Sequence, residues 1–443
     1  MEVQKGALCM TISSALNAGV AGLNANANRL ATISDNIANS GTYGYKRVTT
    51  DFEALVMTGQ QNASSYSAGG VRSSSSRLIA ERGALVSTSS ALDLAVSGRG
   101  MLPVAPQADA DAISAESLQL TTTASFSPDR DGYLKTDSGL VLMGWPAAAD
   151  GTISATSRDT VSGLQPVVIR TNDLAGDPTT AVKLGVNLPA TGTEAEATGE
   201  ALPLTVEYYG NLGTTESLQF TFTPTVPADG SSNSWRMVVT DSASDGAVVG
   251  EYDLVFDATR DGGGALASVT VVAGGAYDAA TGAITLDLGG GPLEMEIGTP
   301  GGESLLTQIG DSFSPTAVGK AGSPVGTLTG VEVNEAGLVV ATYDTGFTRT
   351  LFQVPLVDVP NPDGLTPLDN QAYGVSPDSG AFFLWDAGEG PTGNIAGYAR
   401  EGSTTDVAAE LTSLIQTQRA YSSNAKVIQT VDEMLQETTN IKR

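Results

Sequence analysis

The 443-residue chain contains no histidine and a single cysteine, Cys9. Without histidine there can be no Ser-His-Asp triad, no Cys-His pair and no histidine-ligated metal site. A lone thiol cannot form a disulfide within the chain. The sequence therefore excludes most catalytic and metal chemistry, and we expect no cofactor and no metal ion.

Long apolar runs are also missing. No stretch of 18 or more apolar residues occurs, so we expect no insertion into a membrane. Residues 1–21 fail as a secretory signal, because they hold one lysine, no continuous apolar stretch of signal length and polar residues throughout. If the protein leaves the cell, we expect it to use another route.

Aromatic residues make up only 6% of the chain, whereas glycine is abundant, with 52 residues. Together with stretches rich in Ser and Thr, this composition favours short strands and many turns over large helical domains. The length suggests about three domains. We therefore predict that the bulk of the protein is β.

Basic residues are outnumbered, with 22 Lys and Arg against 49 Asp and Glu and a formal net charge of −27. Residues 1–50 carry +2 and residues 403–443 carry −1, which leaves −28 on the middle of the chain. A strongly acidic middle repels nucleic acid and anionic membranes, so we expect neither as a partner. The nearly neutral ends can associate without that repulsion.

The first segment with a clear helical pattern runs from Ile12 to Ala38 and contains no proline. Apolar residues recur there at heptad spacing, with one more at an alternate position: Leu16, Leu23, Leu30, Ile37 and Val20. This repeat predicts an amphipathic helix. The helix should stop at Asn39-Ser40-Gly41, because Asn and Gly accept the left-handed conformation.

A second heptad pattern occupies the other end of the chain. Its apolar positions are Val407, Leu411, Leu414, Tyr421, Ile428 and Leu435. Ser403, followed three residues later by Asp406, resembles a capping box and predicts the start of this helix.

Each apolar stripe must be buried against something, since an isolated helix of this kind is marginal in water. The simplest partner for each helix is the other. Periodicity alone leaves open whether the helices pack on a core of the same chain or take part in assembly. Weak residues occupy the remaining seam positions, which favours helices that neighbouring copies stabilise: Ala27, Ser34, Gln418 and Asp432.

Both ends resemble a known family. Residues 33–39, followed by 44–47, are similar to the N-terminal signature of the bacterial flagellar rod and hook proteins, and residues 414–435 resemble the closing helix of that family. The motif positions that we single out are Asn36, Asn39, Gly44, Tyr45, Lys46, Arg419, Ala420 and Asn424.

The middle of the chain favours the hook proteins within this family. Residues 206–213 and 218–222 resemble a segment that hook proteins have and the shorter rod subunits lack. A distal rod or hook-associated subunit is the nearest alternative. A secreted β-rich adhesin or carbohydrate-active enzyme is a more remote one, and it leaves both terminal motifs unexplained.

The resemblance implies an α+β, mainly β fold, with N- and C-terminal helices that pair as a coiled coil and two discontinuous β-rich domains. The implied parts are a helical domain of residues 10–40 and 403–443, connecting segments 41–76 and 391–402, a first β domain of 77–146 and 318–390, and an outer β domain of 147–317.

Local composition adds detail to these parts. Ser64–Ser76 is rich in Ser and Gly and has the composition of a linker. Alternating segments predict strands in the outer domain at Leu218–Thr223, Trp235–Thr240 and Ala283–Leu288.

The resemblance further implies a structural protein and not an enzyme. Many copies would self-assemble into a curved, flexible, hollow tube that transmits torque from the basal-body rod to the filament. The implied partners are further copies, the rod, the hook cap, the hook–filament junction proteins and the type III flagellar export apparatus. The implied location is the hook and basal body outside the cell, reached without a cleaved signal peptide. Because the family begins near a motif such as Ile12–Leu16, we also predict Met10 as the true start.

One Asp-rich segment and two Gly-rich segments are similar to ligand-binding loops but have the composition of turns. Asp129–Gly132 is similar to the start of a calcium loop, but Leu140 stands at the twelfth position, so we predict a β-turn. Gly262–Gly264 and Gly289–Gly291 are not followed by Lys-Ser or Lys-Thr, so we predict turns there rather than phosphate loops.

Overall fold

The computed structural model describes residues 3–55, 68–148, 151–154, 157–170, 174–302 and 304–440. It is mainly β with a long helix near each end, as the sequence predicts. The chain forms two compact units: Met1–Thr171, Val331–Ala341 and Arg349–Arg443 make the first, and Asn172–Gly330 with Thr342–Thr348 make the second. The second unit thus starts and ends later than the predicted outer domain.

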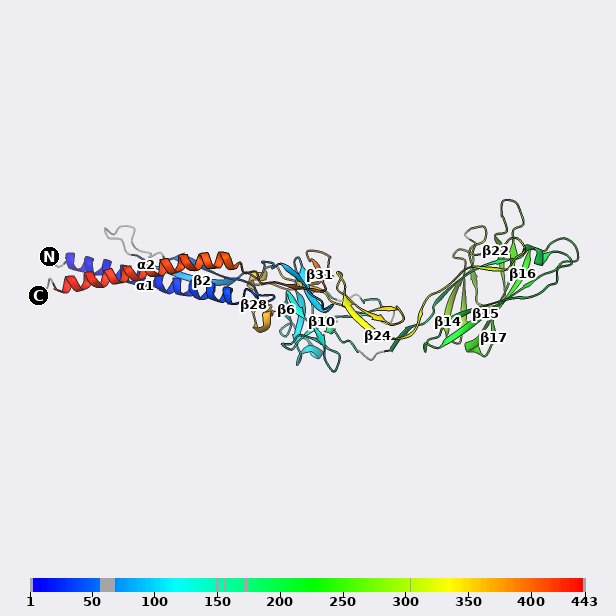
Figure 1. Cartoon of the computed structure of the whole chain (residues 1–443), viewed down its shortest axis with the longest axis horizontal. Coiled ribbons are helices and arrows are strands. Elements are labelled where there is room, and N and C mark those ends of the chain that lie inside the picture. The colour runs from blue at the N-terminus through cyan, green and yellow to red at the C-terminus, as the bar shows by residue number, and fades with distance from the viewer. Residues whose placement is uncertain are drawn as a thin grey trace. The chain divides into compact units, whose positions relative to one another are not determined.

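Helices α1 (Val3–Ala38) and α2 (Val407–Asn440) lie side by side and antiparallel (Figure 1). The pairing of the two ends is therefore confirmed. Helix α1 begins before the predicted Ile12 and ends at the predicted Ala38. The side chains of residues 3–12, which include Cys9 and Met10, lie outside the described part of the chain.

The reason given above for the end of α1 is wrong. Neither Asn39 nor Gly41 takes a positive φ, and the first left-handed residue after the helix is Gly44, at φ 72°. The last turn tightens instead, because the Ser40 amide donates to the Ile37 carbonyl at 3.3 Å.

The predicted cap of α2 is also wrong by one turn. The Asp406 carboxylate accepts hydrogen bonds from the amides of Ala408 (2.9 Å) and Ala409 (3.2 Å), which makes Asp406 the N-cap. Ser403 lies four residues before the first helical residue, too early to cap it. Its hydroxyl accepts from the Thr405 amide at 3.2 Å instead.

A β-hairpin lies against α1. Strands β1 (Val48–Ala54) and β2 (Val71–Arg77) pair antiparallel, and Asn28 of α1 donates to the Ser73 hydroxyl at 3.0 Å. The linker predicted at Ser64–Ser76 is therefore wrong for residues 71–76, because their serines pair along a neighbouring strand. Residues 64–67 lie outside the described part.

The β part of the first unit joins early and late segments of the chain. Its ladders combine β3 (Leu85–Ser87) with β32 (Ala399–Glu401), β31 (Asn394–Ala396) with β4 (Asp93–Ser97) and β7 (Thr123–Ser125), and β27 (Leu356–Asp358) with β30 (Phe383–Trp385). A larger sheet runs through β26 (Thr348–Gln353), β10 (Leu140–Pro146), β5 (Leu102–Pro106), β6 (Gln119–Thr121), β29 (Tyr373–Gly374) and β28 (Thr366–Pro367), with β11 (Gln165–Pro166), β9 (Leu134–Lys135) and β8 (Ser127–Pro128) beside it. Its core includes Ile79, Leu120, Trp145 and Leu384.

Two sheets make up most of the second unit. One is antiparallel in the order β14 (Leu202–Tyr209), β15 (Thr215–Pro224), β16 (Ser234–Asp241), β17 (Ala247–Phe256) and β18 (Leu266–Gly274). The other runs β19 (Tyr277–Asp278), β20 (Ala283–Leu288), β21 (Gly291–Glu296), β13 (Ala181–Leu188) and β22 (Leu306–Gln308), with β23 (Ser314–Lys320) also paired to β13.

Alternate residues of both sheets fill one core, with Phe220 and Met237 from the first and Leu184 and Leu286 from the second. Such alternation buries one face of each strand. The three strands predicted in this region are confirmed as β15, β16 and β20. The remaining strands are β12 (Leu174–Asp177), β24 (Ser323–Val333) and β25 (Leu338–Tyr343).

Candidate functional site: the helix pair and its polar junction

Small and polar residues lie in the contact between the two helices, together with the apolar side chain of Ile428. A Cβ added at Gly19 would lie 3.1 Å from Ile428, and one added at Gly22 would lie 2.7 Å from the Asn424 side chain. On α2, Glu410, Thr417 and Val431 are buried, at intervals of seven and fourteen residues. The helices therefore approach closely at Gly19 and Gly22, because glycine has no side chain.

The predicted apolar stripe does not form this seam. Val20, Val407, Leu411, Tyr421 and Leu435 are exposed, with 37–48% of their surface accessible. Leu16, Leu23, Leu30, Ile37, Leu414 and Ile428 are half-buried. The prediction that the two stripes bury one another is therefore wrong for the exposed set. Glycines at the seam draw the backbones together and leave these larger side chains on the outside of the pair.

At the end of the pair, Asn36 fastens α1 to the next strand and to α2. Its side-chain amide donates to the Val48 carbonyl (2.8 Å) and to Glu410 Oε1 (3.1 Å), and its Oδ1 accepts from the Val48 amide at 2.9 Å. Asn36 is only 1% exposed. These hydrogen bonds engage both the NH2 group and the oxygen of the buried Asn36 side chain, and they therefore fix its position.

Lys46 forms a buried ion pair with the opposite end of the chain. Its Nζ lies 2.7 Å from Glu401 Oε1 and also donates to the Glu81 carbonyl at 2.6 Å. The same Glu401 oxygen accepts from the Gly83 amide at 2.7 Å. Burial lowers the pKa of Lys46, and the Glu401 carboxylate opposes that shift. The pair joins segments 355 positions apart.

Tyr45 lies beside this pair. Its hydroxyl is 2.9 Å from Asp35 Oδ2 and 3.1 Å from Asn36 Oδ1, and the Arg77 guanidinium stacks 5.1 Å from its ring centre. Burial, followed by the Asp35 carboxylate, raises the pKa of Tyr45 to about 12. We call Asn36, Tyr45, Lys46, Glu401 and Glu410 the polar junction.

The other motif positions have diverse surroundings. Asn39 donates to Asp35 Oδ1 at 3.0 Å, and Gly44 takes the left-handed backbone that leads into Tyr45. Asn424 packs against Gly22, whereas Arg419 and Ala420 are exposed on α2. Their role in assembly stays a prediction.

Sequence reasoning missed the acidic partners of this site. Glu401 and Glu410 are two among many acidic residues, and nothing in their local pattern separates them from surface charge. The seam glycines were missed because a heptad pattern weighs large apolar residues. A search for glycines at helical spacing within α1 would have found Gly19 and Gly22.

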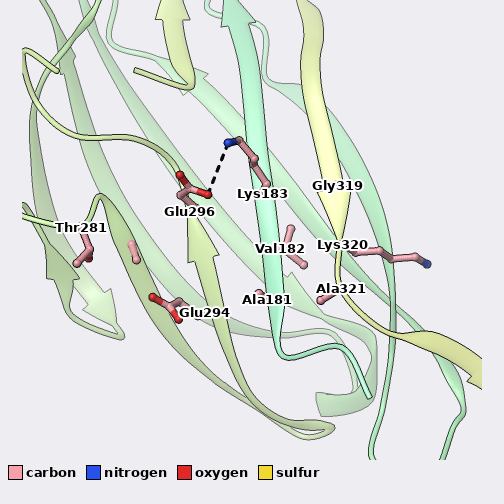
Figure 2. Close-up of a pocket in the computed structure, with 10 residues that line it drawn as sticks. Ala181, Val182, Lys183, Thr281, Glu294, Glu296, Gly319, Lys320 and Ala321 are labelled. Carbon is pink, nitrogen blue, oxygen red and sulfur yellow. Dashed lines mark ion pairs between the residues drawn. The ribbon is translucent and has the colours of Figure 1, made fainter. Parts of the chain in front are cut away.

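A shallow groove of about 460 Å³ lies on the second unit, between strands β13, β21 and β23. Figure 2 shows Lys183 and Glu296 pointing toward one another, at 3.8 Å, while Lys320 points away. The Lys320 ammonium lies 4.0 Å from the centre of the Tyr209 ring. These are surface interactions, and the lining residues do not converge on one point.

The predicted turns are confirmed. The Gly132 amide donates to the Asp129 carbonyl at 3.1 Å, and the Asp129 carboxylate accepts from the amides of Asp131 and Tyr133. Residues 262–264 lie in a turn, as do 289 and 290, whereas Gly291 begins strand β21. Within the described ranges, no group of three or more acidic or thiol side chains could hold a metal ion. In the same ranges, no helix is both long and apolar enough to cross a membrane.

Two family models match the ends of the chain. Residues 16–46 match the model described as flagella basal body rod protein, and residues 396–441 match the flagellar basal body rod FlgEFG protein C-terminal model. Together the two matched ranges contain the whole polar junction. The first contains Asn36, Tyr45 and Lys46, and the second contains Glu401 and Glu410.

Whole-chain relatives extend the likeness to the middle. The flagellar hook protein FlgE of Rhizobium meliloti is 32% identical and that of Brucella abortus biovar 1 is 34% identical, each over 98% of this chain and 100% of its own. Among solved structures, the Helicobacter pylori flagellar hook protein FlgE2 matches 72% of this chain and 99% of its own, with 13% identity and a TM-score of 0.47.

Proposed function

This chain belongs to the flagellar hook protein family, and we propose that it is the subunit from which the hook polymer is built. Its family makes it a structural protein and not an enzyme, located in the flagellar hook and polymerised there. The resemblance seen in the sequence is confirmed. The observation that carries this function is the alignment with hook relatives along nearly the full length of both chains.

The full-length alignment also favours a hook subunit over a rod subunit. The two models named for rod proteins cover only residues 16–46 and 396–441. The middle of the chain is shared with the hook relatives, which span it from end to end.

The exposed stripe on the helix pair is our candidate for the contact between copies. Val20, Leu411 and Tyr421 leave 43–48% of their surface accessible. The half-buried leucines and isoleucines of both helices would add to this face. Apolar side chains gathered on a helix face favour burial against another surface. A contact that repeats from copy to copy without closing gives an open helical polymer.

The finer parts of the function rest on the family. The polymer would be a curved, flexible, hollow tube that carries torque from the rod to the filament. Its further partners would be the rod, the hook cap, the hook–filament junction proteins and the type III export apparatus, which would export it without a cleaved signal peptide. For the organisation of the chain we propose a helical domain (10–40 and 403–443), connecting segments (41–76 and 391–402) and two β domains.

Electron microscopy of cells that lack the gene tests this function. Complementation with the full-length protein should restore curved hooks, whereas a version that ends before Ser403 should not, because it lacks α2. The matched control is the full-length Gln418→Ala variant, which changes an exposed polar residue of α2 and should restore hooks. Immunoblotting shows that each version is made. Normal hooks and filaments in the uncomplemented strain would overturn the proposal.

A further inference from the structure

Several buried polar atoms have no hydrogen-bond partner among the described residues, and two of them, on groups of opposite charge, lie at or next to the polar junction. They are Arg82 Nη1 and Glu401 Oε2. Glu401 is 1% exposed, and its other oxygen carries both the Lys46 ammonium and the Gly83 amide. A buried charged donor and a buried charged acceptor each gain free energy when they find a hydrogen-bond partner.

The backbone places Arg82 next to the ion pair. Its neighbour Glu81 offers a carbonyl to Lys46, and its other neighbour, Gly83, donates its amide to Glu401. A Cβ added at Gly83 would lie 2.0 Å from the Gly402 carbonyl oxygen, so the two segments touch. Burial lowers the pKa of Arg82, and the Glu401 carboxylate is the largest opposing influence.

The Arg82 side chain instead reaches the β part of the same unit. Its Nη2 donates to the Gly100 carbonyl at 3.1 Å. Gly100 has φ 111°, and an added Cβ would lie 3.1 Å from Leu356, so its backbone passes close to β27. The next residue, Met101, bridges to Val357 of that strand. Arg82 is therefore a tie between the polar junction and the buried sheets.

We propose that Arg82 is a two-position arm, which exchanges the Gly100 carbonyl for the unpaired oxygen of Glu401 and thereby gives the polar junction two packings. In the second position the guanidinium satisfies Glu401 Oε2 while Lys46 keeps Oε1. A hydrogen bond to a neutral carbonyl is replaced by one to a carboxylate, while the Gly100 carbonyl loses its donor. The tie to Gly100 is then released.

This device bears on the proposed function and rests on it for its purpose. A tube that rotates while bent needs subunits whose packing switches between discrete states. An arginine that chooses between two buried acceptors supplies such a switch where the helix segments join the β part. The exchange itself is a property of the single chain and can be measured without assembly.

Relaxation dispersion of guanidinium signals tests the exchange in the full-length soluble protein labelled with ¹⁵N-arginine. The Arg82 signal is assigned by its loss in Arg82→Lys. We expect that signal to show exchange with a second form populated at about 1–10%. Glu401→Gln should abolish the exchange, because a neutral amide no longer attracts the guanidinium. Asp386→Asn, which removes the partner of Arg158 (2.7 Å) elsewhere in the unit, should leave it unchanged.

A static Arg82 signal in the wild-type protein would overturn the proposal, and so would exchange that persists undiminished in Glu401→Gln. A buried water that bridges the two atoms would give the static result. If Glu401→Gln does not fold, relaxation dispersion of the wild-type protein still distinguishes an Arg82 side chain that exchanges from one that is static. Because this readout uses single chains, its failure leaves the hook function standing. Loss of the hook function in the complementation test would equally leave the exchange measurable.

Discussion

Tyr45 shows how one hydroxyl helps to fix the polar junction. Its ring is 6% exposed, and its hydroxyl lies within hydrogen-bonding distance of Asp35 and Asn36. We expect Tyr45→Phe to lower the free energy of unfolding by about 1–2 kcal/mol at neutral pH, because the one hydroxyl proton that lies between the Asp35 and Asn36 oxygens is lost. Urea unfolding followed by helical circular dichroism measures this loss.

The same hydroxyl gives a dependence on pH. The pKa of Tyr45 is raised in the folded protein to about 12, above its ordinary value of 10.0. The unfolded chain therefore releases this proton first as the pH rises. The stability that Tyr45 contributes is fully present below pH 10 and is lost as the pH approaches about 12.

A comparison of two variants isolates that contribution. Wild type and Tyr45→Phe should differ below pH 10 and converge toward pH 12. Tyr421→Phe is the control, because Tyr421 is 44% exposed on α2 and loss of its hydroxyl should change stability little. An unchanged difference across this range of pH would contradict the assignment.

Asp406 is the residue on which the start of α2 depends. Asp406→Ala should destabilise the first turn of α2 by about 1 kcal/mol, because two helix amides lose their acceptor. Hydrogen exchange of the amides of residues 408–410 should speed up accordingly. Ser403→Ala is the control, since the Ser403 hydroxyl accepts from the Thr405 amide, which precedes the helix. If the two substitutions speed up hydrogen exchange equally, Ser403 also caps the helix, as the sequence predicts.

At the scale of the helices, the separation of α1 from α2 is set by the seam glycines. Gly22→Ala should destabilise the helix pair by about 1–3 kcal/mol, because the new Cβ would lie 2.7 Å from Asn424 and must displace it. That cost outweighs the gain of about 1 kcal/mol in helix propensity.

Thermal unfolding followed by helical circular dichroism checks the sign. Gly41→Ala provides the matched control, because an added Cβ there meets nothing within 4 Å and the residue has no positive φ. Stabilisation by Gly22→Ala, as helix propensity alone predicts, would show that the helices are not held at this distance.

The elements could be predicted from the sequence because their patterns are local. Heptads predicted both helices, although α1 begins before the predicted Ile12, and strand alternation predicted strands such as Ala283–Leu288 at their observed positions. The hairpin strand Val71–Arg77 was missed because four consecutive serines look like a linker, whereas here they pair with β1. Strand pairing of this kind depends on a partner that the local sequence does not contain.

The candidate site was only half predictable for a similar reason. Asn36, Tyr45 and Lys46 belong to a motif and could be singled out. Their partners Glu401 and Glu410 lie at the other end of the chain, and only the fold brings them together. The heptad residues could be identified, but the face that they form was wrongly predicted to lie between the helices. The close approach at Gly19 and Gly22 determines which face of each helix contacts the other.

At the scale of the whole molecule, we expect different residues of the helices to serve folding and assembly. The seam and the polar junction use small, polar and charged groups to hold the two ends of one chain together. Large apolar side chains such as Val20, Leu411 and Tyr421 remain accessible, whereas Ile33 and Val431 are buried. Removing a buried partner such as Glu401 would therefore disturb the single chain, by leaving the Lys46 charge without compensation. Removing an exposed apolar residue would disturb only contacts between chains.

Leu411 allows this separation to be tested. Leu411 is 48% exposed on α2, so Leu411→Ser should change the stability of the single chain by no more than about 0.5 kcal/mol. It should nevertheless reduce polymer formation, because an apolar contact is lost at every repeat of the helix. Sedimentation of the purified protein under polymerising conditions, with electron microscopy of the pellet, measures the effect.

Gln418→Ser is the matched control for this change, since it alters an exposed polar residue on the same helix and should leave polymer formation intact. Wild-type polymer yield from Leu411→Ser would show that this face is not the contact between copies. An unfolded Leu411→Ser chain would show instead that the residue supports the single chain, and the stripe would then belong to folding. Reduced polymer from a stable monomer is the outcome that assigns the exposed stripe to assembly.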